Sequence, residues 1–207
     1  MRKSKKAETE KSRRGVILLF LALLFLAAIT VLALLLARGE GSKKSESYIY
    51  NGFVFERQAG LWFTEIQRAG TAQVYRIPLH FGPLELENIS LAGDSRAWLS
   101  AHNSSYITFD PGEAELSYVA LAAGELAISM ARILGFNLTA ACTANLTKAC
   151  ASRPIVSCGS GLPVIYLEQA DQPEVIVGLS CIRVRGKGAG LVAAVDRLLL
   201  AWFGIML

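Results

Sequence analysis

Apolar and polar residues first divide the chain near its start. A run of 22 residues, 16–37, contains no charged side chain, and Arg13, Arg14 and Arg38 flank it. An α-helix rises 1.5 Å per residue, so the run is about 33 Å long and exceeds a bilayer core of about 30 Å. The pattern therefore predicts a transmembrane helix over residues 15–38.

Beyond residue 48 the apolar residues follow shorter periods, which are typical of a folded domain. Residues 53–56, 61–67 and 73–78 are rich in β-formers and are separated by Ala59-Gly60 and Ala69-Gly70, so they predict an N-terminal β-meander. Residues 84–91 and 106–109 predict two more strands. Further short apolar runs predict later strands, the last two joined as a hairpin through Gly178-Leu179-Ser180; they are 138–143, 154–158, 163–167, 174–177 and 181–184.

Two helices complete the pattern. Asp110 as N-cap, Pro111 at the first helical position and Glu113 in a capping box predict a central amphipathic helix that ends at Gly135. Glu125 and Arg132 are expected on its solvated face. The face expected to be buried consists of Leu116, Val119, Ala120, Ala123, Ala127, Met130 and Leu134.

Residues 190–207 predict a C-terminal helix that is apolar on most sides except at Asp196 and Arg197. It fits either the core of the domain or a helix whose end, 198–207, enters the membrane interface. The fold class predicted is α+β: an N-terminal transmembrane helix, then one extracytoplasmic domain with a β-meander, a central amphipathic helix, further short strands and a C-terminal helix. The boundaries predicted are a basic cytoplasmic tail at 1–14, a signal-anchor helix at 15–38, a flexible linker at 39–47 and the domain at 48–207.

The distribution of charge sets the orientation of the anchor. The whole chain has a net charge of +4, yet residues 1–14 carry +5 and residues 48–207 carry −2. By the positive-inside rule, the short tail is cytoplasmic and the domain lies outside the cell membrane. The run is longer than the apolar region of a cleaved signal peptide, so we expect an uncleaved, single-pass anchor. The partners expected are membrane lipid, through residues 16–37, and an unidentified protein or envelope component, but not nucleic acid, because the basic residues belong to the anchor.

Two features favour an extracellular or otherwise oxidising compartment. Four of the five asparagines, Asn88, Asn103, Asn137 and Asn145, begin an Asn-x-Ser/Thr sequon, which predicts glycosylation at exposed positions. All four cysteines follow residue 141 and predict two disulfides, with three pairings possible. We favour Cys142–Cys150 and Cys158–Cys181 because each pair joins near neighbours in a plausible sheet.

Sequence motifs for catalysis or metal binding are weak. Gly93-Asp94-Ser95 resembles the Gly-Asp-Ser block of a hydrolase family, but the late Asp-x-x-His of that family is missing from the sequence. His80 and His102 are far from the cysteines, and the sequence contains no Cys-x-x-Cys motif, so we predict no catalytic residues, no metal site and no cofactor. One candidate anion-binding segment lies between a predicted strand and helix and comprises Arg183, Arg185, Gly186, Lys187 and Gly188.

These observations favour a non-enzymatic, membrane-anchored surface glycoprotein with a binding or structural role in the envelope. One alternative is a filament subunit, because Arg14-Gly15 before Val16-Ile17 resembles the peptidase site of archaeal-type pilins; Phe20 stands where bacterial pilins have Glu. Another alternative is a membrane-anchored enzyme. A binding protein should expose an apolar patch, an enzyme should cluster polar groups in a pocket, and a pilin should lose residues 1–15.

Overall fold

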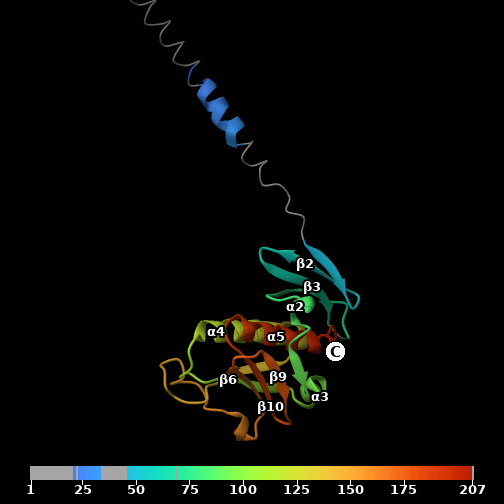
Figure 1. Ribbon diagram of the computed structural model, residues 1–207, viewed down its shortest axis with the longest axis vertical. Helices are drawn as coiled ribbons and strands as arrows, with labels where there is room; N and C mark the ends of the chain where they lie inside the picture. The colour runs from blue at the N-terminus through green and yellow to red at the C-terminus, as the bar shows by residue number, and fades with distance from the viewer. Residues whose placement is uncertain (1–20, 22, 34–45, 69, 207) are drawn as a thin grey trace, which may run out of the picture. The chain divides into compact units, whose positions relative to one another are not determined.

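The computed structural model describes residues 21, 23–33, 46–68 and 70–206. The chain divides into two compact units, 1–45 and 46–207. In the first unit an apolar helix covers Leu23–Ala33, within the predicted transmembrane run (Figure 1). The basic tail, both ends of the apolar run and the linker up to residue 45 lie outside the described residues.

The second unit contains ten strands and several helices among its described residues. One helical stretch there, Leu116–Leu134, is long and apolar enough to span a membrane, but it packs into the core of this unit. The strands are β1 (Ser47–Tyr50), β2 (Phe53–Gln58), β3 (Leu61–Gln67), β4 (Val74–Leu79), β5 (Ser90–Ala92), β6 (Ser104–Phe109), β7 (Asn137–Ala140), β8 (Val164–Gln169), β9 (Glu174–Val177) and β10 (Cys181–Gly186). The helices are α2 (Pro83–Leu86), α3 (Ser95–Ala101), α4 (Leu116–Ser129) with its π-helical continuation η1 (Met130–Leu134), the short 3-10 helix η2 (Cys158–Ser160) and α5 (Ala189–Trp202).

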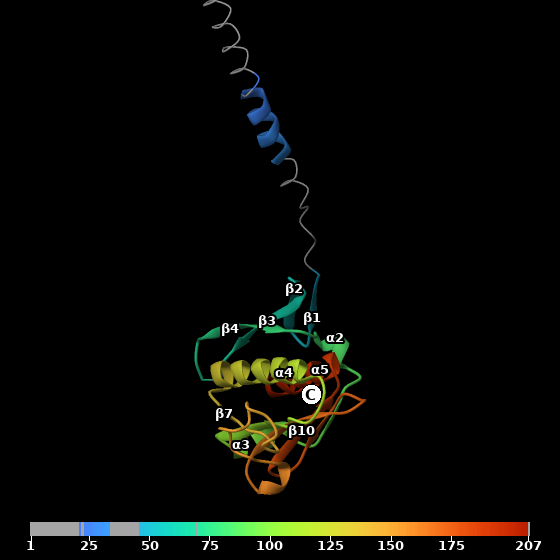
Figure 2. The same cartoon turned by 90° about the vertical axis from the view of Figure 1, so that its left-hand side faces the viewer.

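The folded unit has three layers. Strands β1 to β4 form an antiparallel sheet in sequential order, and a mixed six-stranded sheet has the order β5-β9-β10-β8-β6-β7. Helices α4 and α5 lie side by side between the two sheets, while α3 lies beside the second sheet (Figures 1 and 2). The α+β class, the meander and the C-terminal helix are therefore confirmed.

The meander follows from strand alternation and from two tight turns. In β3, Trp62, Thr64 and Ile66 are buried, while Glu65 and Gln67 between and after them are exposed. Backbone φ is positive at both residues of Asn51-Gly52 and of Ala59-Gly60, the conformation that matches the twist of a two-residue hairpin. The first strand, β1, was not predicted from the sequence.

The mixed sheet is built around β8 and β10, which pair in parallel, with β6 on the other side of β8. Strand β9 pairs antiparallel with β10, so the hairpin predicted through residues 178–180 is confirmed. Residues 154–158 do not form a strand; Ile155 makes a single bridge to Cys142. This segment instead leads into η2, because its cysteine is held by a disulfide to β10.

Helix α5 is the centre of the unit. All of its residues from Leu191 to Trp202 are buried, because α4 packs beside it and a sheet covers it on each side. One continuous core joins Phe55 and Trp62 of the meander with Ile165 and Ile182 of the mixed sheet. The core alternative for the C-terminal helix is therefore confirmed, although the helix ends at residue 202.

Two predictions of local structure are wrong. Residues 84–91 form α2 and β5 rather than one edge strand, because Pro83 begins a helical turn and the Glu85 carboxylate accepts the Gly82 N–H. The central helix begins at Leu116 rather than after Asp110. Asp110 instead accepts the Gly112 N–H in a turn. The Glu113 carboxylate accepts the N–H of Gln169, the last residue of β8.

The buried face of α4 is rotated from the predicted one. Its buried residues are Val119, Ala122, Leu126 and Ser129, and Leu116 is 37% exposed. The prediction that Glu125 faces solvent is wrong, because its side chain is only 8% exposed and contacts His80. His80, which follows β4 of the meander, covers the helix at this residue, where the amphipathic pattern predicted contact with water.

Candidate functional site

A pocket of about 460 Å³ lies between α4 and the segment that follows β7. Its walls are mainly apolar, and its polar contributors are Thr147 and Arg153. The complete lining is Ile107, Phe109, Leu116, Val119, Ala120, Ala123, Ala140, Ala141, Thr147, Ala149, Arg153 and Leu167. A ligand-sized apolar concavity with few polar groups is the usual form of a small-molecule or side-chain binding site.

The sequence builds this pocket from small side chains and a closed loop. Leu116, Ala120 and Ala123 belong to the apolar face predicted for the central helix, and they line the pocket. Alanines at this face leave space that larger side chains would occupy. The Cys142–Cys150 disulfide, between cysteines eight positions apart, closes a segment that carries Thr147 and Ala149 on the opposite wall.

A second, more open concavity of about 580 Å³ lies over the meander. Two of its charged side chains are paired: Arg76 lies 3.5 Å from the Glu56 carboxylate and 4.5 Å from the centre of the Phe63 ring. Exposed Val54 and Val74 also line it. Because this concavity is more open, we regard the pocket beside α4 as the stronger candidate.

A separate polar cluster lies inside the unit, where β4, α4 and α5 meet. His80 Nδ1 lies 2.8 Å from Glu125 Oε2, and Asp196 Oδ2 accepts the Phe81 N–H at 2.8 Å. The Asp196 side chain is fully buried, and its Oδ1 has no hydrogen-bond partner. Burial, and then the neighbouring Glu125 carboxyl, raise the pKa of Asp196 well above its ordinary value.

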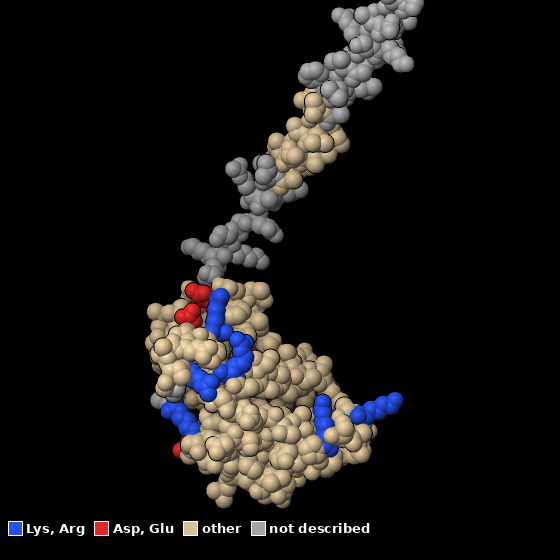
Figure 3. Space-filling model, turned by 180° about the vertical axis from the view of Figure 1, so that it is seen from behind, with Lys and Arg blue, Asp and Glu red and all other residues tan. Residues whose placement is uncertain are grey.

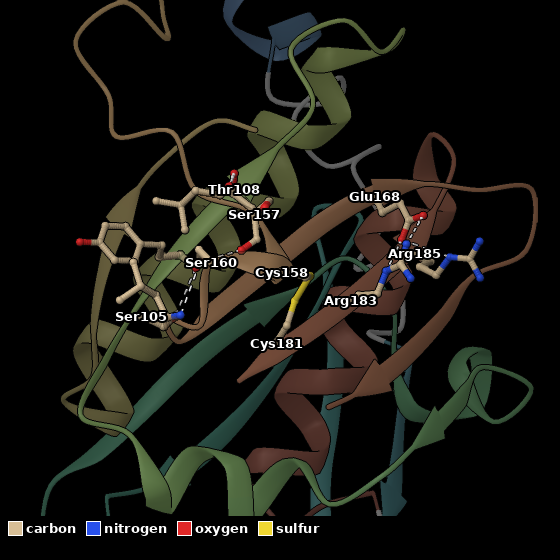
Figure 4. The surroundings of a disulfide bond; sticks show 12 residues. Ser105, Thr108, Ser157, Cys158, Ser160, Glu168, Cys181, Arg183 and Arg185 are labelled. Atoms are coloured by element: carbon tan, nitrogen blue, oxygen red, sulfur yellow. Dashed lines mark hydrogen bonds and ion pairs between the residues drawn. A yellow bond between two sulfur atoms is a disulfide. The ribbon is translucent and has the colours of Figure 1, made fainter. Parts of the chain in front are cut away.

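The sequons and cysteines lie where their predicted roles would require. Asn88, Asn103, Asn137 and Asn145 are all exposed, which is compatible with glycan attachment but does not test it. The structure contains two disulfides, Cys142–Cys150 and Cys158–Cys181, which is the pairing favoured from the sequence. Figure 4 shows the second of these beside Ser157 and Ser160.

The segment predicted to bind an anion is occupied by ion pairs of its own. Arg183 makes two contacts of 2.8 and 2.9 Å with the Glu168 carboxylate, and Arg185 pairs with Glu168 and Glu174 (Figure 4). Gly186, Lys187 and Gly188 connect β10 to α5. A Cβ atom added to Gly188 would lie 3.4 Å from Glu115 Oε2, so a carboxylate already stands beside the start of α5. Anion binding there stays a prediction.

The remaining motif residues have structural roles. Asp94 is the N-cap of α3 and accepts the N–H groups of Arg96 and Ala97, while Ser95 is buried and its carbonyl accepts Trp202 Nε1. His102 Nδ1 lies 2.7 Å from the carbonyl oxygen of Trp98. These contacts leave Gly93-Asp94-Ser95 without the arrangement of a hydrolase nucleophile among the described residues.

Sequence reasoning missed the polar cluster because its three residues are separated by 45 and 71 positions. The available signal was Asp196, which together with Arg197 interrupts an otherwise apolar helix. The sequence analysis also missed the pocket. One of its walls is the irregular segment after β7, whose path cannot be predicted from a repeating pattern of apolar residues. Comparison with protein-family models, curated proteins and solved structures found no match to this chain.

Proposed function

We propose that the chain is a membrane-anchored surface glycoprotein whose external domain binds an apolar group of an envelope partner in the pocket beside α4. The observation that carries this proposal is the pocket itself, with its apolar walls and disulfide-closed rim. The exposed sequons and paired cysteines fit an oxidising compartment. The pocket lacks the cluster of polar groups that was expected of an enzyme.

The lining indicates the chemistry of the bound group. Alanine, leucine and phenylalanine side chains favour a compact apolar group, and Arg153 at the rim favours a negative charge beside it. On the face of the unit shown in Figure 3 most of the surface is uncharged, and the charged side chains that are visible are mainly Lys and Arg.

Phenylpropanoate is a suitable soluble probe because it joins an aromatic ring to a carboxylate. The full chain, held in lipid nanodiscs, would be labelled at alanine methyl groups and titrated with the probe. We expect the methyl resonances of Ala120, Ala123 and Ala149 to shift, and that of Ala131, an exposed alanine of η1 outside the pocket, to remain unchanged.

Filling the pocket provides the matched test. Ala120→Trp should abolish the shifts at Ala123 and Ala149, whereas Ala131→Trp should preserve them, because only residue 120 lines the pocket. Equal shifts in both variants would refute binding at this site.

The topology requires a separate measurement, the intact mass of the protein from its native membrane before and after reduction and alkylation. We expect a full-length chain, heavier by glycan, that gains four alkyl groups only after reduction. Loss of residues 1–15 would favour the filament-subunit alternative instead. A bare chain with four free thiols would contradict the external location.

A further inference from the structure

We propose that His80, Glu125 and Asp196 form a binding site for a Zn²⁺ ion. Each residue offers one ligand atom, and these three atoms lie within 4.8 Å of one another. His80 follows β4, Glu125 lies in α4 and Asp196 lies in α5, so the ion would join the end of the meander to both central helices. The site is distinct from the apolar pocket, whose lining shares no residue with it.

The donor set selects the class of metal. An imidazole nitrogen and carboxylate oxygens are ligand types that zinc accepts, and three protein ligands would leave a fourth position for water. Calcium and magnesium prefer six or more oxygen ligands, which this cluster does not supply. The 2.8 Å contact between His80 Nδ1 and Glu125 Oε2 is shorter than the separation of two ligands on one zinc ion, so these two atoms must move slightly apart on binding.

Asp196 provides an independent indication that the cluster accommodates a ligand. Its side chain is completely buried, Oδ2 accepts one backbone N–H, and Oδ1 has no hydrogen-bond partner. An unpaired buried carboxylate oxygen is costly, because it loses its water without gaining another donor. A cation coordinated by this oxygen would remove that cost.

The charged group that acts on Asp196 also favours a cation. After burial, the Glu125 carboxyl raises the pKa of Asp196, whereas the backbone amides of Phe81 and His80 act in the opposite direction and lower it. Two carboxyl groups held this closely repel one another when both are ionised, and a divalent ion compensates both charges.

An entry path exists on one side of the cluster. The His80 side chain is 35% exposed, whereas that of Glu125 is 8% exposed. An ion would therefore meet the imidazole first and the two carboxylates behind it. Because the ion would be held by three elements of the folded domain, binding should also raise the temperature at which this domain unfolds.

The experiment uses the full oxidised chain in lipid nanodiscs, after free thiols have been shown to be absent. Zn²⁺ would be titrated in competition with a chromophoric chelator, and thermal unfolding would be followed with and without the ion. We expect one bound ion per chain and a higher unfolding temperature. His80→Gln should weaken binding at least tenfold and remove the thermal shift.

The chain supplies its own control, because His102 is its only other histidine. His102→Gln should bind Zn²⁺ like the unchanged protein, since His102 is held by the Trp98 carbonyl and lies outside the cluster. Binding that His80→Gln leaves intact, or that His102→Gln removes, would overturn the proposal, as would the absence of binding to the unchanged protein.

A second measurement does not require any variant to fold. With only two histidines, the ring nitrogen resonances of the unchanged protein form two sets. Zn²⁺ should shift the set of His80, chiefly at Nδ1, and leave the set of His102 in place. A shift confined to His102 would refute the site, whereas loss of the pocket-binding function would not affect this result.

Discussion

At the scale of single residues, Gly82 shows how closely the meander packs on α2. Its backbone conformation suits any residue, yet a Cβ atom there would lie 2.2 Å from the Tyr48 hydroxyl and 3.2 Å from the Trp62 ring. Both the Gly82 N–H and Trp62 Nε1 donate to one Glu85 oxygen at 2.7 Å. The same enclosure, mainly through burial, raises the pKa of Tyr48 to about 12.

We therefore predict that Gly82→Ala lowers the free energy of unfolding by about 1–3 kcal/mol, the usual cost of overpacking. Gly124→Ala is the matched control, because a Cβ atom at that helical position meets no heavy atom within 4 Å. It should raise the stability by about 0.5–1 kcal/mol by favouring the helix. Thermal unfolding followed by circular dichroism would measure both changes, and a Gly82→Ala variant as stable as the parent would contradict the packing described.

Local sequence rules worked where a few adjacent residues determine the geometry. They located the turn at Ala59-Gly60 and the helix end at Gly135, which indeed adopts positive φ. They misplaced Asp110 and Glu125, because the first forms an alternative turn and the second is covered by a distant segment. The polar cluster could not be derived from the sequence, since only the tertiary fold brings its members together.

At the scale of elements, the two disulfides hold the irregular segment between β7 and β8. Cys142–Cys150 spans eight positions and forms one wall of the pocket, whereas Cys158–Cys181 spans 23 and ties η2 to β10. The observed pairing was favoured from the sequence, although three pairings were possible. The path of residues 142–157 was not derivable from it, because this path follows from these constraints rather than from a repeating pattern of apolar residues.

The lengths of the two closed loops predict an order of stabilisation. In the chain-entropy view, Cys142–Cys150 should contribute about 2.5 kcal/mol and Cys158–Cys181 about 3.5 kcal/mol. Each contribution can be isolated by removing the other disulfide through paired Cys→Ala substitutions and then measuring the loss of stability on reduction.

The loss on reduction should be larger in the variant Cys142→Ala/Cys150→Ala, which retains the longer loop. This comparison avoids the packing cost of the alanines, because each variant is its own reference. Equal or reversed losses would show that strain or residual structure in the unfolded chain outweighs loop length.

At the scale of the whole domain, a single core connects both sheets through α5. Trp62 enters this core from the meander, while Trp98 and Trp202 pack together on the other side with ring centres 6.5 Å apart. Within residues 46–68 and 70–206 the apolar core continues from one sheet to the other, because the buried α5 contacts residues of both. The meander and the mixed sheet should therefore unfold together rather than as separate domains.

The three tryptophans allow this cooperativity to be tested. In Trp62→Phe the fluorescence reports only the side of the core that holds Trp98 and Trp202, whereas circular dichroism reports all secondary structure. We expect the two signals to change at the same temperature, because loss of the meander would expose the apolar surface of α5 and remove the support of the second sheet. The variant Trp98→Phe, which keeps Trp62, should likewise give coincident transitions. If circular dichroism instead changed before the fluorescence of the Trp62→Phe variant, the meander would be an independently unfolding layer, and α5 would not be the shared core that the packing indicates.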